Sequence, residues 1–305
     1  MATKRFSRML VLVKPETTYG TDAGPTAAAN AMLMTDVAVE MQFDTEVAPK
    51  TTTYLGAQQQ TLYNLRGQLT GTVELAGSGA AGTAPAYGVL DRACGFAAVG
   101  GDFSPASDGH ESVTVYAYFD DAWHKLLGAR GDWSENWSTG APKATYTLTG
   151  FWTEPAATDF DTLSPDYSAF EAPLPISGDN TSKITLHGWE TCGSELTLSG
   201  GNQIKFDSIM GCTGIYITDR EITGNIVVTP ADLGTFNPWA VAAAGTLGNF
   251  SVQHGTAAGA IVKRTAPKVQ VMPPTRQDRD GLLMWNIPLR FIPNAGDDEL
   301  VKGVA

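Results

Sequence analysis

The sequence is short of cysteine, of positive charge and of long apolar runs. Its three cysteines, Cys94, Cys192 and Cys212, are too few and too scattered for a disulfide framework, so we expect buried thiols in a reducing cytoplasm. The chain has 20 basic against 32 acidic residues and a formal charge of −12. This balance argues against a non-specific nucleic-acid binder, because tight phosphate contact needs patches of lysine and arginine.

Targeting and membrane signals are also missing. The apolar run at residues 9–13 is too short for a signal peptide, although it follows a basic start. No stretch approaches the ~20 apolar residues of a membrane span. We therefore expect a protein that is synthesised in the cytoplasm and does not associate with a membrane.

Recognisable catalytic patterns are few. The motifs GxSxG and GxxxxGK[ST] do not occur, and the four histidines lie far apart without an HExxH or HxH spacing. The Gly-rich run 76–85 lacks the lysine of a phosphate loop, and we expect it to be a flexible surface loop. The sequence thus predicts no catalytic residue, no metal site and no cofactor, and a protein that is not an enzyme.

What the sequence does contain is an internal repeat. Residues 66–75 read RGQLTGTVEL and residues 219–228 read DREITGNIVV, so that LTG at 69–71 falls on ITG at 222–224, 153 residues later. In both copies alternate residues are apolar or glycine and the others are mostly polar, which is the pattern of a strand with one buried face. The repeat predicts a duplicated domain.

The same offset aligns two short helices. It places Pro85 on Pro238 and Gly95 on Gly248, and each pair brackets an alanine-rich apolar stretch, with proline at the start and glycine at the end. Further strand patterns follow at 112–119 and 144–152 in the first copy, and at 249–254, 267–272 and 282–292 in the second.

The fold class predicted from these patterns is mainly β, with two tandem β-sandwich-like domains that each carry one flanking short helix. We expect the first domain at residues 1–155 and the second at 156–305. The segment at about 153–183 is rich in Pro, Asp and Ser, which is typical of a linker.

A short run near the start of the chain carries a family resemblance. It consists of Glu16, Thr17, Thr18, Tyr19, Gly20, Thr21 and Asp22, followed by Pro25-Thr26 and by NAML at 30–33. This run resembles the N-terminal signature of the major tail tube proteins of long-tailed, siphovirus-like bacteriophages, although it covers little of the chain. The resemblance implies domains of two packed sheets flanked by one helix. It also implies that six such domains close a ring, and that rings stack into a hollow tube.

Two copies in one chain change the expected stoichiometry. If both are tube domains, three chains supply the six domains, and the ring is a trimer with pseudo-sixfold symmetry; a homohexamer is the alternative. The resemblance implies that the partners are other copies of the chain, other tail proteins at the tube ends, and double-stranded DNA that passes without specific binding. It implies a place in the virion tail.

The resemblance also assigns roles to particular residues. We expect residues 16–22 to contact the next ring, with Tyr19 as the aromatic anchor; an ordinary surface loop is the alternative. The polar faces of the repeated strands are candidates for the wall of the channel, and the outer surface is the alternative place for them. These candidates are Gln68, Thr70, Thr72, Glu74, Glu221, Thr223 and Asn225. An acidic or neutral wall would let DNA pass without holding it.

Two other function classes remain open at this point. A carbohydrate-binding or adhesin-type β-sandwich module could use Trp123, Trp133, Trp137 and Trp152 as a platform on which sugars stack. An unrecognised hydrolase would need a perturbed carboxylate or histidine in a cleft.

Overall fold

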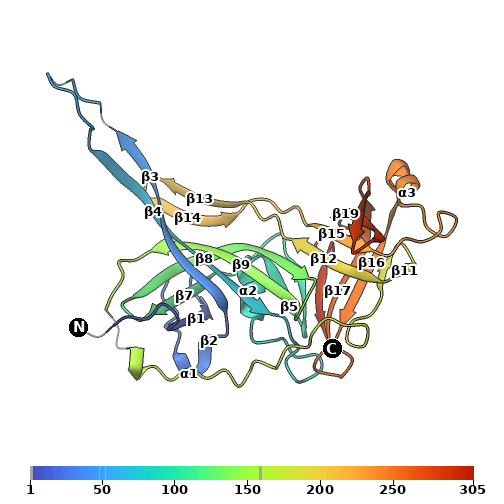
Figure 1. Cartoon of the computed structure of the whole chain (residues 1–305). Coiled ribbons are helices and arrows are strands. Elements are labelled where there is room, and N and C mark those ends of the chain that lie inside the picture. Colours follow the sequence, from blue (N-terminus) through green and yellow to red (C-terminus); the bar gives the residue numbers. More distant parts are fainter. Residues whose placement is uncertain (1–2, 48, 52, 158–159) are drawn as a thin grey trace.

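The computed structural model describes residues 3–47, 49–51, 53–157 and 160–305 (Figure 1). The protein is built mainly from antiparallel strands, as the alternating patterns predict. In β4 (Gln60–Glu74), Leu69 and Val73 are buried while Thr70 and Thr72 are half-buried. Because successive side chains of a strand point to opposite faces, the apolar residues of this strand line the core and the hydroxyl groups lie on the other face.

The first half of the chain, up to the end of β9, contains most of the long strands. Its elements are β1 (Met9–Pro15), α1 (Ala27–Asn30), β2 (Ala31–Met32), β3 (Thr35–Val47), β4, α2 (Gly88–Ala93), β5 (Phe96–Val99), β6 (Asp102–Pro105), β7 (Val113–Phe119), β8 (Trp123–Trp137) and β9 (Lys143–Trp152).

The second half follows a segment whose described residues include a 3₁₀ turn at Phe160–Thr162. Its elements are β10 (Ile184–Leu186), β11 (Trp189–Thr191), β12 (Gly193–Ser199), β13 (Ile204–Ile209), β14 (Cys212–Ile217), β15 (Thr223–Val228), α3 (Pro238–Ala244), β16 (Leu247–His254), β17 (Val262–Val271), β18 (Thr275–Arg279), β19 (Leu282–Phe291) and β20 (Val301–Val304).

Both halves have the same strand order. The neighbours in the first half are β1-β7-β8-β9-β4-β3. In the second half they are β10-β16-β17-β19-β15-β12. If the six strands of each half are numbered along the chain, both orders read 1-4-5-6-3-2, and every pair is antiparallel. A shorter strand, β2 or β11, pairs with the outer side of the first strand in each case.

The two aligned helices lie where the repeat places them. Helix α3 begins at Pro238, the side chain of Asn237 accepts a hydrogen bond from the Ala240 N–H, and Gly245 ends the helix in the left-handed conformation. Helix α2 begins three residues after Pro85 and ends just before Gly95, which also has a positive φ. The first half also contains α1, a turn of four residues that begins after Thr26.

The two halves share a continuous sheet. Strand β12 of the second half pairs with the end of β8 of the first half, with Leu196 opposite Trp137 and Ser199 opposite Ser134. We call this pairing the internal seam. It produces an antiparallel run in the order β3-β4-β9-β8-β12-β15-β19-β18, which we call the continuous sheet. Its end strands, β3 and β18, come from different halves.

The larger of the two hydrophobic clusters among the described residues lies behind this sheet. It includes Leu69 and Trp133 from the first half and Phe250 and Ile287 from the second. The C-terminal strand β20 pairs with β17 and also touches β6 of the first half, so it joins the halves a second time.

Two expectations about individual side chains need correction. Cys94 is buried, but Cys192 and Cys212 are exposed, because Cys192 follows the edge strand β11 and Cys212 begins β14, beside the turn of the outlying β13–β14 hairpin. The four tryptophans do not form one platform. Trp133 and Trp137 are only 2% and 3% exposed, since β8 turns these alternate residues toward the core.

Candidate functional site

The outward face of the continuous sheet is polar and almost free of charge along its middle. Cross-strand neighbours on this face carry hydroxyl or amide groups, and the hydroxyls of Thr72 and Thr145 lie 2.9 Å apart. The stripe runs across five strands and consists of Thr70, Thr72, Thr145, Thr147, Ser134, Asn136, Thr197, Ser199, Thr223 and Asn225. Two open depressions of about 600 and about 700 Å³ follow it and share Ser134, Thr145 and Ser199.

Charged side chains flank this stripe in opposite-sign pairs. Glu74 lies 3.8 Å from Lys143, and Glu221 lies 2.6 Å from Arg290. On β3 and β4, Asp44 lies 3.2 Å from Arg66, and the hydrogen bond from Asn64 holds the pKa of Asp44 below its usual value. The sequence candidates Glu74 and Glu221 are therefore locally compensated, and the face is closer to neutral than the net charge of the chain suggests.

Asp132 also lies on this face, but it forms no ion pair with a basic residue among the described residues. Its burial raises the pKa of the carboxyl, and backbone N–H groups that include that of Asn202 oppose this effect only in part. The carboxylate holds the loop after β12 through its hydrogen bond from the Asn202 N–H. Because its pKa is raised, this group ionises less readily than an exposed aspartate.

The structure brings the channel-wall candidates together only in part. Thr70 and Thr72 lie on β4 and Thr223 and Asn225 on β15, with β9, β8 and β12 between them, so one sheet carries both groups. Gln68 continues the same face, and its side-chain oxygen accepts a hydrogen bond of 2.8 Å from the Gln42 amide of β3. Glu74 and Glu221 lie at the margins. Whether this face lines a channel stays a prediction.

The two end strands of the continuous sheet offer unpaired edges. Among the described residues no strand pairs with the outer edge of β3 or of β18. All five residues of β18 are exposed. An exposed strand edge is a template for pairing with another chain.

The β3–β4 hairpin extends far beyond the body of the protein (Figure 1). Apolar side chains that are exposed by 40% or more lie along it: Met41, Phe43, Val47, Tyr54, Leu55, Leu62, Tyr63 and Leu65. Such a concentration marks an interaction surface rather than scattered surface residues. The sequence reasoning missed this hairpin, although the apolar residues among the charges of 39–47 were a signal for it.

The β13–β14 hairpin of the second half lies against the first half. The ring of Phe206 packs edge-to-face on Phe151, with centroids 6.2 Å apart. Arg130 donates to the Ile215 carbonyl at 2.7 Å, and the Ile215 N–H donates to the Tyr19 hydroxyl at 2.6 Å. Tyr19 therefore anchors a contact within the chain, between the two halves.

The rest of the segment 16–22 is held partly by the body of the same chain. The Glu16 carboxylate accepts hydrogen bonds from the Ser112 and Thr114 hydroxyls and from the Gly20 and Gly128 N–H groups. Asp22 accepts from the Tyr116 hydroxyl and from Lys125. Thr17, Thr18 and Thr21 are exposed and face outward beside them. A contact of this segment with another ring stays a prediction.

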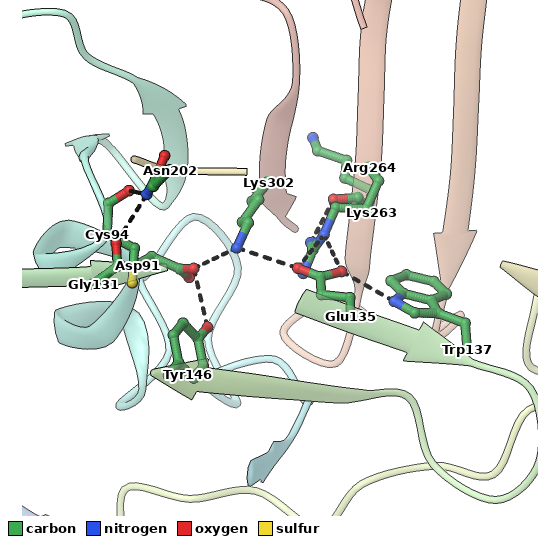
Figure 2. A network of polar contacts seen from close by, with 10 residues as sticks. All are labelled: Asp91, Cys94, Gly131, Glu135, Trp137, Tyr146, Asn202, Lys263, Arg264 and Lys302. Atoms are coloured by element: carbon green, nitrogen blue, oxygen red, sulfur yellow. Dashed lines mark hydrogen bonds and ion pairs between the residues drawn. The ribbon is translucent and has the colours of Figure 1, made fainter. Parts of the chain in front are cut away.

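A buried charge network joins the halves (Figure 2). The Lys302 ammonium lies 2.6 Å from Asp91 Oδ1, 3.3 Å from Glu135 Oε1 and 3.5 Å from the centre of the Trp133 ring. Arg264 donates to both oxygens of Glu135 at 2.9 Å. Because Lys302 and Arg264 belong to the second half and Asp91 and Glu135 to the first, every ion pair in the network crosses between them.

Glu135 and Arg264 keep their charges despite their burial. Burial disfavours the charged forms, but the neighbouring cations outweigh it and lower the pKa of Glu135. Burial also opposes the charge on Arg264, and the Glu135 carboxylate outweighs it and raises the pKa of that guanidinium. No sequence motif signals these four residues, since up to 211 positions separate them.

Other chemistry finds little support. Residues 77–82 read GSGAAG, a spacing found in dinucleotide-binding loops, but α2 starts only at Gly88, and the Gly79 N–H donates to the Gly259 carbonyl. In the described part of the chain, no three or more His, Cys, Asp or Glu residues gather as a metal site. Within the same residues, no helix has both the length and the apolar character to cross a membrane.

The comparisons with known proteins give one family. A family model described as "Phage tail tube protein" matches residues 7–299. A search of curated proteins gave no match.

Proposed function

The chain belongs to the phage tail tube protein family, and from this premise we propose that it forms trimeric rings with pseudo-sixfold symmetry, which stack into the tube through which DNA leaves the capsid. In this proposal the protein is a structural subunit of the virion tail and not an enzyme. Its partners are other copies of itself and other tail proteins at the tube ends, and it is synthesised in the host cytoplasm. Each ring contains three chains and six domains.

The identical strand order in the two halves is the observation that best supports a ring of three chains. Two halves with the order 1-4-5-6-3-2 are the arrangement expected of a duplicated domain, and the internal seam joins them side by side in one sheet. We propose domains at 1–155 and 156–305 with the linker at about 153–183. Three such pairs of domains supply the six positions that a ring of single domains would fill with six chains.

The polar stripe is the proposed wall of the channel. Threonine, serine and asparagine side chains have no charge that would hold a DNA phosphate, and the flanking carboxylates would repel a polyanion were they not paired with Lys143 and Arg290. A nearly neutral hydroxyl and amide surface thus lets double-stranded DNA pass without specific binding. We assign Gln68, Thr70, Thr72, Thr223 and Asn225 to this wall, with Glu74 and Glu221 at its margins.

The contact between rings is proposed for residues 16–22 and for the β3–β4 hairpin. The threonines at 17, 18 and 21 provide exposed hydroxyl groups, while the hairpin provides the apolar area from which a stable interface gains most of its energy.

Imaging and mass measurement of the purified protein test this proposal together. Negative-stain micrographs should show rings or tubes, and native mass spectrometry should give a ring of about 97 kDa, three times the chain mass of 32.3 kDa. A ring of six chains would replace the trimer by the homohexamer. A protein that stays monomeric at all concentrations and salt conditions, and whose thermal midpoint rises with a glycan, would instead support the carbohydrate-binding module.

A further inference from the structure

The buried pair of Lys302 and Asp91 holds an amine in contact with a carboxyl group and away from water (Figure 2). Both side chains are 2% exposed, and Lys302 Nζ lies 2.6 Å from Asp91 Oδ1. The other lysines that pair with a carboxylate among the described residues are at least 27% exposed, and so are their partners. Within this set, Lys302 is therefore the lysine placed for a reaction that water would suppress.

Transfer of a proton within this pair gives two neutral groups that can react with each other. When the Lys302 ammonium passes a proton to Asp91, a free amine faces a carboxylic acid, and burial favours neutral groups over charged ones. The carboxyl carbon is one C–O bond beyond Oδ1, so the amine nitrogen is at most about 4 Å from it. This separation is close to the approach of about 3–3.5 Å from which a nucleophile attacks.

Two further groups have the positions that such an attack requires. The Glu135 carboxylate lies 3.3 Å from Nζ. Burial opposes its charge, but the neighbouring cations lower its pKa, so it can take up the proton that the amine gives up. The Tyr146 hydroxyl donates to Asp91 Oδ1 at 3.0 Å and can stabilise the negative charge that develops on this oxygen.

The charges of the site stay balanced after the reaction. An amide between Lys302 and Asp91 removes one positive and one negative charge together. Glu135 keeps Arg264, which donates to both of its oxygens at 2.9 Å. The product therefore leaves no buried charge without a partner, which would be costly in this surrounding.

We propose that Lys302 and Asp91 condense to an amide bond, which links β20 of the second half covalently to α2 of the first. The lysine nitrogen attacks the carboxyl carbon, and Glu135 carries a proton from this nitrogen to the departing oxygen. The C–N bond forms, the C–O bond breaks, and one water molecule leaves. The reaction needs no further reagent and takes place once in each chain. It does not depend on the proposed ring.

The aromatic rings around the nitrogen decide how fast the bond forms. Trp133 and Phe96 have ring centres 3.5 and 4.6 Å from Nζ, and they keep water away from it. The same rings favour the ammonium form, so we expect the first proton transfer to limit the rate. Protein of full mass carries the ion pair, and protein lighter by one water molecule carries the bond. The mass thus tells which state any stability measurement on Lys302 reports.

Intact-mass spectrometry of the folded chain tests this proposal. After incubation at neutral pH, the protein should be lighter by one water molecule than its sequence mass of 32.3 kDa. Peptide mapping should find residues 91 and 302 in one branched peptide. Lys302→Arg keeps the positive charge without a reactive amine, and it should keep its full mass. Asp91→Asn should lose ammonia in place of water, because the amide nitrogen then departs.

Two variants separate a role in the reaction from a role in folding. Glu135→Gln keeps the shape of the side chain and should slow bond formation at least about tenfold, in protein that circular dichroism shows to be folded. The matched control is Asp207→Ala, which removes the partner of the exposed Lys205 at 3.0 Å and should leave the rate unchanged. If Lys302→Arg does not fold, the ammonia loss of Asp91→Asn and the branched peptide decide the question.

A loss of water has another possible source. Asp108-Gly109 and Asp280-Gly281 are exposed and can close to cyclic imides, which also releases one water molecule. Such imides open again in mild base, whereas the amide between side chains persists. A folded protein that keeps its full mass would overturn the proposal, as would a loss that survives in Lys302→Arg or reverses in mild base. Rings built from chains of full mass would overturn the bond and leave the proposed function standing.

Discussion

Replacing the buried Lys302 by methionine tests how strongly the charge network joins the two halves. Methionine at this position keeps the length of the side chain and removes the ammonium that contacts Asp91 and Glu135. Glu135 would keep Arg264 and the Trp137 indole N–H, but Asp91 would keep only the Tyr146 hydroxyl among the described residues. Removing one partner of a buried ion pair costs about 3–5 kcal/mol, so we expect Lys302→Met to lower the free energy of unfolding by about this amount.

Guanidinium denaturation of the unassembled protein, followed by tryptophan fluorescence, measures this loss. The matched control is Lys205→Met, which removes an exposed lysine 3.0 Å from Asp207 and should cost no more than about 1 kcal/mol. The double variant Lys302→Met with Asp91→Asn should recover most of the stability, because the asparagine can still accept from Tyr146 and no uncompensated charge remains.

Two results would refute this reasoning. A loss below about 1 kcal/mol for Lys302→Met would mean that the network contributes little beyond packing. A double variant as unstable as the single one would mean that the lost methylene and ring contacts, rather than the stranded carboxylate, cause the effect.

The other predictions concern the wall, the hairpin and a half-buried histidine. Glu74→Lys and Glu221→Lys together should leave assembly intact and slow DNA ejection, because each replaces a negative charge of the proposed wall by a positive one; unchanged infectivity, with Glu190→Lys as the exposed control, would count against the lumen assignment. Phe43→Ser with Leu65→Ser should leave the melting temperature unchanged, since both side chains are over 40% exposed, and raise the protein concentration needed for tube formation at least tenfold in light scattering. Burial lowers the pKa of His124, so its stabilising effect is complete above the unfolded pKa of about 6.5 and is lost as the pH falls toward the folded value. His124→Phe, between the rings of Phe119 and Trp152, should therefore lessen the fall in stability from pH 7 to pH 5; a slope unchanged from the parent would exclude this histidine as the cause.

Local patterns in the sequence were enough to predict the strands and helices of the repeat. The alternation at 69–75 and 222–228 marks the buried faces of β4 and β15, because a strand with one face in the core needs an apolar residue at every second position. Proline and glycine at the ends of the alanine-rich stretches located α2 and α3 for the same kind of local reason.

Such local patterns could not predict which distant strands and side chains pair with one another. Nothing in the sequence near Ser134 or Ser199 distinguishes the internal seam from any other strand pair, since a strand edge is made of backbone groups that every residue carries. The network around Glu135 was equally hidden, because a glutamate between Ser134 and Asn136 has the same local sequence context whether it is buried and paired or exposed. The opening segment was recognised, yet its tyrosine proved to contact Ile215 of the same chain.

The internal seam has a consequence for the molecularity of assembly. In the proposed ring, half of the junctions are already closed when each monomer folds, because β8 and β12 are tethered by the intervening chain and meet at an effective concentration that a free partner rarely reaches. Nucleation of a ring then requires three chains to meet rather than six, so tubes should start to form at a lower protein concentration. Buried ion pairs also hold the junction within each chain, while the junctions between chains can stay weak enough for a wrongly added subunit to leave.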